Sequence, residues 1–205
     1  AAKPRSEAKR EPIVAAEVES APVAVLEQHA AKSVEDLITF SGSSRLLRMT
    51  LWLIDASSDE IGELWETLDA QDALDHKTNN ILMIHWVERD PRAAIAAARN
   101  SGMESVAWWA WGRADPEEAL EVALQESPWF AANVLRSVGQ FHLDLALRLM
   151  EKHPEALGGS AVEGIGSGLA KEDPRRAVEF LRTRGKTAGD ELKTWVARDP
   201  DAALA

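Results

Sequence analysis

Histidine and carboxylate side chains are the groups of this sequence that could bind a metal ion. The chain has five histidines and no cysteine, and no two histidines are three or four residues apart. Zinc sites usually show that spacing or a Cys/His cluster. Residues 55–75 hold eight acidic residues and no Lys or Arg, but they lack the alternating acids and the turn glycine of a calcium loop. The sequence therefore predicts no metal site, and we interpret residues 55–75 as a solvated or partner-facing helix surface.

Residue patterns for covalent catalysis and phosphate binding are also weak. The run Gly164, Gly166, Gly168 has no preceding strand and no Lys-Ser/Thr ending of a phosphate loop. Gly164 and Gly168 instead lie one helical turn apart, which allows another helix to approach closely, at about 1 kcal/mol per glycine relative to alanine. A Ser/His/Asp triad stays open, because its members can be distant in sequence. We expect a non-enzymatic protein with no catalytic residue and no cofactor.

Tryptophan residues are the first candidates for a binding surface. The chain has eight Trp and no Tyr, and three of the Trp are Trp108, Trp109 and Trp111. On a helix Trp109 points about 100° away from Trp108, so it either packs on the next pair of helices or is exposed. An exposed Trp109 near Trp129 would make a hot spot for a protein partner or a stacking platform for a sugar ring.

A basic cluster is the second candidate. It consists of Arg175, Arg176, Arg182, Arg184 and Lys186, with Glu179 as its acidic neighbour. These cations either hold an acidic segment, such as residues 55–75 of another copy, or stabilise the C-terminus of their own helix. The predicted partner-binding residues are Trp109, Trp129, Arg175, Arg176 and Arg182. The expected partner is a protein, and self-association is an open alternative.

Composition narrows the partner class. Of 205 residues, 45% are apolar, enough for a sizeable core, and acidic residues exceed basic ones by 34 − 23 = 11. This negative charge repels phosphate backbones and anionic lipids, so we expect no nucleic-acid partner. No stretch reaches the roughly 18 consecutive apolar residues of a membrane span, so we expect no direct membrane insertion.

The body of the chain has the apolar periodicity of helices. In residues 59–69, for example, Ile61, Leu64, Trp65 and Leu68 lie at i, i+3, i+4 and i+7, and Ser58 stands before them as the expected N-cap. No stretch shows sustained period-two alternation. The sequence predicts an all-α fold.

The chain is expected to have two parts. Residues 1–32 contain nine alanines and three prolines, with five basic and five acidic residues, which is typical of a flexible linker. Residues 33–205 form the predicted helical domain. The absence of Cys, the Ala-Ala start and the tether-like tail favour an exported or periplasmic location over a cytoplasmic one. A repeat begins shortly before Ala205, so we expect the natural protein to continue.

Six of the nine prolines share one local pattern. Its clear copies centre on Asp90-Pro91, Asp115-Pro116, Asp173-Pro174 and Asp199-Pro200, and its weaker copies on Ser127-Pro128 and His153-Pro154. In the clear copies, large apolar residues, mostly Trp, stand five positions before the proline, and alanine stands three positions after it. Proline bars the preceding residue from the α region and suits the first helical position, and the Asp caps the new helix. Each Asp-Pro is therefore predicted to end one helix and to start the next.

The spacing of these prolines predicts an architecture. They lie 25, 12, 26, 20 and 26 residues apart, and about 25 residues suffice for two short helices and tight turns. Such a hairpin cannot bury its own apolar faces, so we expect hairpins to stack into an α-solenoid, a right-handed superhelix of short antiparallel helical hairpins.

The Asp-Pro helix junction with nearby alanines resembles tetratricopeptide and related α-solenoid repeats. Over residues 81–205 it is more similar to bacterial Trp…Asp-Pro…Ala-Ala repeats, because a spacing of thirty-four residues and the tetratricopeptide Gly and Tyr positions are not reproduced. The resemblance implies a protein–protein interaction scaffold that binds through a curved face, and it assigns no functional residue. Two alternatives stay open: an extracytoplasmic carbohydrate binder that uses exposed Trp, and a helical accessory domain of a larger enzyme.

Overall fold

The computed structural model describes residues 31–204, and all regular structure in this range is helical. It has thirteen α-helices, one short 3-10 helix and no strand within residues 31–204. The predicted all-α fold is confirmed. The chain divides into two compact units, residues 1–52 and 53–205. The expected linker, residues 1–32, lies almost wholly outside the described residues.

The first unit contributes two described helices, α2 (Val34–Ile38) and α3 (Gly42–Trp52). Ser33 caps α2, since its hydroxyl oxygen accepts the backbone N–H of Asp36 at 3.3 Å. Arg45 donates from Nε to the Phe40 carbonyl at 2.7 Å, which ties α3 to the preceding turn.

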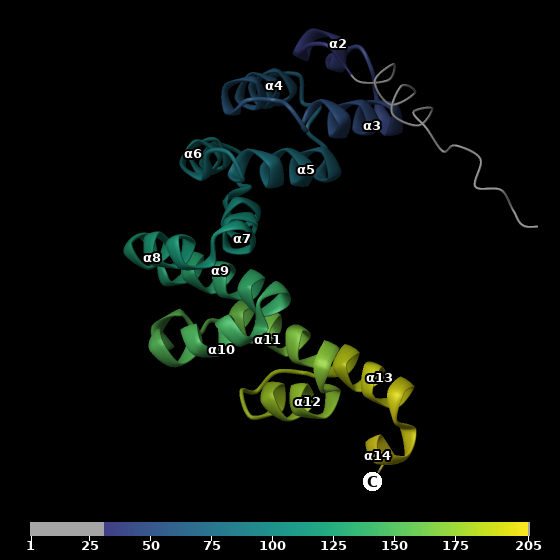
Figure 1. Cartoon of the computed structure of the whole chain (residues 1–205), viewed down its shortest axis with the longest axis vertical. Coiled ribbons are helices and arrows are strands. Elements are labelled where there is room, and N and C mark those ends of the chain that lie inside the picture. Colours follow the sequence, from purple (N-terminus) through teal and green to yellow (C-terminus); the bar gives the residue numbers. More distant parts are fainter. Residues whose placement is uncertain (1–30, 205) are drawn as a thin grey trace, which may run out of the picture. The chain divides into compact units, whose positions relative to one another are not determined.

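The second unit is built from two alternating sets of helices. They are α4 (Ser58–Ala70), α5 (His76–Val87), α6 (Pro91–Ser101), α7 (Glu104–Ala114), α8 (Pro116–Glu126), α9 (Pro128–Phe141), α10 (Leu143–Lys152), η1 (Pro154–Ala156), α11 (Gly159–Glu172), α12 (Pro174–Arg182), α13 (Gly189–Arg198) and α14 (Pro200–Leu204). Each odd-numbered helix from α5 to α11 packs on the next odd-numbered helix, and we call this set the odd-helix layer. Each even-numbered helix from α6 to α12 packs on the two odd-numbered helices that flank it in sequence (Figure 1).

The Asp-Pro junctions form as the sequence predicts. Asp90, Asp115 and Asp173 each precede a helix that has Pro at its first position. Their carboxylates accept the N–H of the residue three positions on at 2.9, 3.2 and 3.0 Å. Asp199 does the same at 3.0 Å. Each Asp therefore satisfies a backbone donor that the helix itself leaves unpaired.

One weaker copy of the repeat lacks a cap, and one predicted cap is wrong. His153 makes no capping hydrogen bond, because its Nδ1 lies 3.2 Å from the Glu155 carboxylate, and only the 3-10 helix η1 follows Pro154. Helix α4 is capped by Ser57 instead of Ser58, through a capping box with Glu60. Ser58 is used elsewhere, since its hydroxyl accepts the indole N–H of Trp86 at 3.0 Å.

The cap of α5 gives the stability a defined pH dependence. Asp75 accepts the backbone N–H of Thr78 at 2.8 Å, and this hydrogen bond lowers the pKa of the Asp75 carboxyl below its ordinary value. A lowered folded-state pKa adds stability above the unfolded-state pKa of about 3.9, and this stability is lost as the pH falls through the folded-state value.

We therefore expect Asp75→Asn to lower the free energy of unfolding at neutral pH and to lower it less in acid. Urea denaturation of both proteins at a series of pH values measures this difference. A difference between variant and wild type that stays constant from about pH 6 to about pH 3 would contradict a role for this carboxylate.

Helices α9 and α11 approach each other closely through glycines, as the spacing of Gly164 and Gly168 predicts. A Cβ atom on Gly168 would overlap the Gly139 carbonyl oxygen, and one on Gly164 would overlap the Arg136 backbone. From the other side, a Cβ on Gly139 would lie 2.5 Å from the Ile165 nitrogen. The backbones of the two helices are thus in direct contact, with no room for a side chain between them.

Candidate functional site

The odd-helix layer contains a pocket of about 300 Å³ between α5, α7 and α9, which we call the odd-helix pocket. Its polar and aromatic lining includes His76, Asn80, Trp109, Asn133 and Arg136. The pocket combines an aromatic wall with several hydrogen-bond donors, a composition typical of binding sites in proteins.

Trp109 is half-buried and forms a wall of this pocket. Its indole N–H donates to the Gln140 side-chain oxygen at 3.0 Å, and its ring meets Phe141 edge-on, 5.6 Å between centroids. Both partners belong to α9. Trp109 therefore packs on the following odd-numbered helix and still faces the pocket, so it combines the two alternatives that the sequence leaves open.

Trp129 is the second residue of α9 and is 56% exposed. It lies on the same side of the helix as Asn133, Arg136 and Gln140, which follow at i+4, i+7 and i+11. Its ring contacts Phe130, whereas Trp109 contacts Phe141, so the two Trp have different aromatic partners. The structure thus places Trp109 and Trp129 on adjacent helices that share the pocket.

The predicted basic residues lie elsewhere. Arg175, Arg176 and Arg182 belong to α12, whereas the pocket is lined from α5, α7 and α9. Arg175 pairs with Glu179 at 3.4 Å, and both side chains are largely exposed. The structure therefore does not bring Arg175, Arg176 or Arg182 to the pocket.

The two other basic side chains of this cluster have partners of their own. Arg184 stacks on Phe180 with 3.8 Å from Cζ to the ring centroid, and Lys186 pairs with Glu163 at 2.9 Å. Part of the cluster's charge is thus already matched within the chain.

Asn133 and Arg136 are pocket residues that the sequence analysis missed. Asn133 is 6% exposed and donates from Nδ2 to the Trp129 carbonyl at 3.0 Å. Arg136 is exposed and has no hydrogen bond or ion pair with any residue of the described range. Their spacing from Trp129 was the available signal, since residues at i+4 and i+7 share a helix face.

A second missed feature is a row of basic side chains that bind backbone carbonyls of the preceding odd-numbered helix. Lys171 donates to the Gln140 carbonyl at 2.6 Å, and Arg198 donates to the Lys171 carbonyl at 3.0 Å. Helix C-termini carry unpaired carbonyls and partial negative charge, which cations stabilise. In the sequence these residues stand two or three positions before the proline of a repeat.

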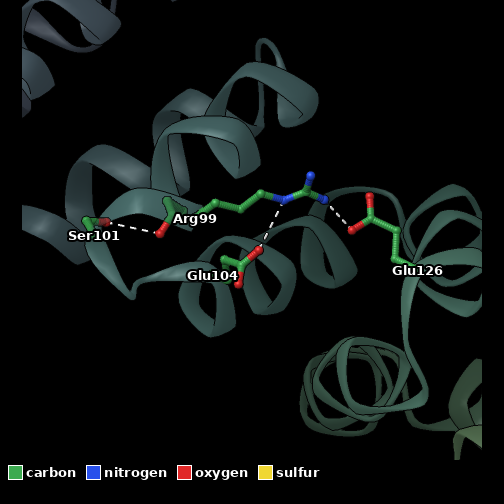
Figure 2. A network of polar contacts seen from close by, with 5 residues as sticks. Arg99, Ser101, Glu104 and Glu126 are labelled. Atoms are coloured by element: carbon green, nitrogen blue, oxygen red, sulfur yellow. Dashed lines mark hydrogen bonds and ion pairs between the residues drawn. The ribbon is translucent and has the colours of Figure 1, made fainter.

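A second groove, with a volume of about 200 Å³, is lined by α6, α7 and α8. At its edge Arg99 joins three helices, because it donates from Nε to Glu104 at 3.2 Å and pairs through a terminal nitrogen with Glu126 (Figure 2). The three side chains are partly exposed. This network is an ion-pair link between α6, α7 and α8.

We expect Arg99→Ala to lower the free energy of unfolding by about 1 kcal/mol at low salt, because Glu104 and Glu126 lose their common cation. The loss should shrink at high salt, since ions screen partly exposed charges. Urea denaturation at two salt concentrations measures this loss of stability. Arg148→Ala is the control, since Arg148 is exposed on α10 and has no partner within residues 31–204; an equal loss in both variants would contradict the role of the network.

None of the helices within residues 31–204 combines the length and apolar character needed to span a membrane. The same range contains no group of three side chains arranged to hold a metal ion. Comparison of the chain with protein-family models, curated proteins and solved structures found no match.

Proposed function

We propose that this protein is a non-enzymatic scaffold that binds a partner protein through its odd-helix layer. In this proposal the helices of the second unit form a right-handed α-solenoid of stacked hairpins. Two observations support the stack: the recurrent Asp-Pro junction, and the packing of each helix on its neighbours in sequence. The resemblance to tetratricopeptide-like repeats points to the same class of protein.

The observation that carries the proposal is the odd-helix pocket with its exposed aromatic surroundings. Trp109 lines it, Trp129 is 56% exposed beside it on α9, and Phe141 is 46% exposed against Trp109. Aromatic side chains and arginine are enriched at protein interfaces and supply much of the binding energy. The pocket adds Arg136 and two amide side chains, which can fix the orientation of a bound segment.

Site-specific crosslinking tests this surface directly. A photo-reactive amino acid at Ser105, which lines the pocket, should give a crosslinked product of discrete mass in cells of the source organism. The same probe at Gln125, exposed on the even-numbered helix α8, is the matched control. Crosslinking at Ser105 should fall in the Trp129→Ala variant. Equal yields of the same product from Ser105 and Gln125 would contradict binding through the odd-helix layer.

The exposure of Trp129 also favours a second candidate, a carbohydrate-binding helical domain. An accessible indole can stack on a sugar ring. Two results together would favour this candidate over the first proposal. Soluble glycans would quench the tryptophan fluorescence of the wild type but not of Trp129→Ala, and the probe at Ser105 would give no crosslinked protein.

A further inference from the structure

The three helices around the odd-helix pocket differ in charge from the rest of the chain. The protein carries a net charge of −11, yet α5, α7 and α9 contain a single acidic residue, Glu104. That carboxylate is held by Arg99 of α6 (Figure 2). The neighbouring helix α8, by contrast, has four glutamates and no basic residue. Acidic charge is thus concentrated beside the pocket helices and nearly absent from them.

Arg136 is a cation of the pocket that pairs with no residue of the described range. Its side chain is exposed, and no carboxylate of the described chain pairs with it. The amides of Asn80 and Asn133 and the hydroxyl of Ser105 lie in the same lining, which contains no acidic residue. A guanidinium group presents donors in a fork that matches a carboxylate, and nearby neutral donors can complete its hydrogen bonds. The single positive charge of the Arg136 guanidinium also matches the single negative charge of a carboxylate.

Trp129 lies on the same face of α9 as Arg136, whereas Phe141, the last residue of the helix, lies about 140° away from Arg136 around its axis. Trp129 stands seven residues before Arg136, and Phe141 five residues after it. Phe141 lies near two further cations, with the Arg113 guanidinium 5.2 Å and the Lys171 ammonium 5.5 Å from its ring centroid. From Trp129 to Gln140 the helix rises about 16 Å, the length of about five residues of an extended peptide. Trp129 and Arg136 are about 10 Å apart along the axis, or about three extended residues.

We propose that the odd-helix pocket recognises an extended acidic segment of the partner protein, with a carboxylate on Arg136 and an apolar residue about three positions away on Trp129. This inference rests on the proposed function and specifies the chemistry of its partner. The segment is about five residues long, carries Asp or Glu, and lies along α9 between Trp129 and Gln140.

Selection from a display library of random heptapeptides on the full chain tests the inference. Enriched peptides should contain Asp or Glu with an apolar residue about three positions away. A fluorescent synthetic copy of an enriched peptide should bind at least about tenfold more weakly to Arg136→Glu than to the wild type, as expected when a charge-assisted contact is lost. Its affinity should also fall as salt is added.

Arg148→Glu is the matched control, because Arg148 is likewise an exposed helical arginine without a partner in the described range, but lies on α10. It should retain wild-type affinity, and circular dichroism should show both variants folded. Enrichment of peptides without acidic residues, no enrichment, or equal losses in the two variants would overturn the inference. If crosslinking at Ser105 then persists in Arg136→Glu, the partner binds at the odd-helix layer but is not recognised through a carboxylate on Arg136. If the wild type shows no specific crosslinking at Ser105, both the proposed function and this inference are wrong.

Discussion

Replacing Gly168 by alanine is expected to lower the free energy of unfolding by about 3 kcal/mol, the upper part of the range for overpacked sites. The added Cβ would overlap the carbonyl oxygen of Gly139 on the facing helix, and backbone atoms cannot move aside as a flexible side chain can. Helices α9 and α11 would have to separate, although they share the most extensive contact between helices in the second unit. The gain in helix propensity from Gly to Ala, about 1 kcal/mol, offsets only part of this cost.

Urea denaturation followed by circular dichroism measures the effect. The control is Gly189→Ala, at the first residue of α13, where an added Cβ meets nothing within 4 Å. Gly189→Ala should leave the stability within about 1 kcal/mol of the wild type or raise it. Similar losses in the two variants would show that the tight contact at Gly168 is not the cause.

Trp108→Ala is expected to lower the free energy of unfolding by about 4 kcal/mol, because truncating a large core side chain leaves a cavity. Trp108 is fully buried and stacks on Trp111 and Phe130, with centroid distances of 5.5 and 5.3 Å. Phe130 belongs to α9, so the indole links two helices of the odd-helix layer.

Trp129→Ala removes the same residue type from an exposed site and should change the stability by about 0.5 kcal/mol or less. Thermal and urea unfolding of both variants measure the contrast. If binding through Trp129 is correct, the two substitutions separate folding from function: the first destabilises the protein, and the second lowers partner binding with the fold intact. Comparable losses of stability would show that Trp129 belongs to the core.

The local features of this fold could be predicted from the sequence because they depend on neighbouring residues. Asp-Pro fixes the backbone of two consecutive residues, so the starts of α6, α8 and α12 followed directly. Trp108 and Trp111 are three residues apart and therefore share a helix face, and both are buried. The N-cap of α4 was misplaced by one residue, because Ser57 and Ser58 are equally good caps and a tertiary contact of Ser58 with Trp86 decides between them.

The odd-helix pocket could not be predicted in this way. It depends on which faces of α5, α7 and α9 meet, and this is set by packing between helices that lie dozens of residues apart. The residue types draw attention to Trp109 and Trp129 in the sequence but not to Asn133 or Arg136, which share a helix face with Trp129. The sequence also favours Arg175, Arg176 and Arg182 because they cluster in it, whereas the structure places them on another helix.

The α-helices of the second unit pack on α-helices one or two places away in the chain, and this has an evolutionary consequence. Consider a duplication or deletion of the gene segment that encodes one even-numbered and one odd-numbered helix. It would bring an odd-numbered helix against another odd-numbered helix, as in the present fold, with an Asp-Pro at the junction. The remaining interfaces would stay as they are, since no distant contact needs to be rebuilt. The number of odd-numbered helices would therefore change together with the number of even-numbered ones. If the proposed binding through the odd-helix layer is correct, the length of the binding surface would change with them.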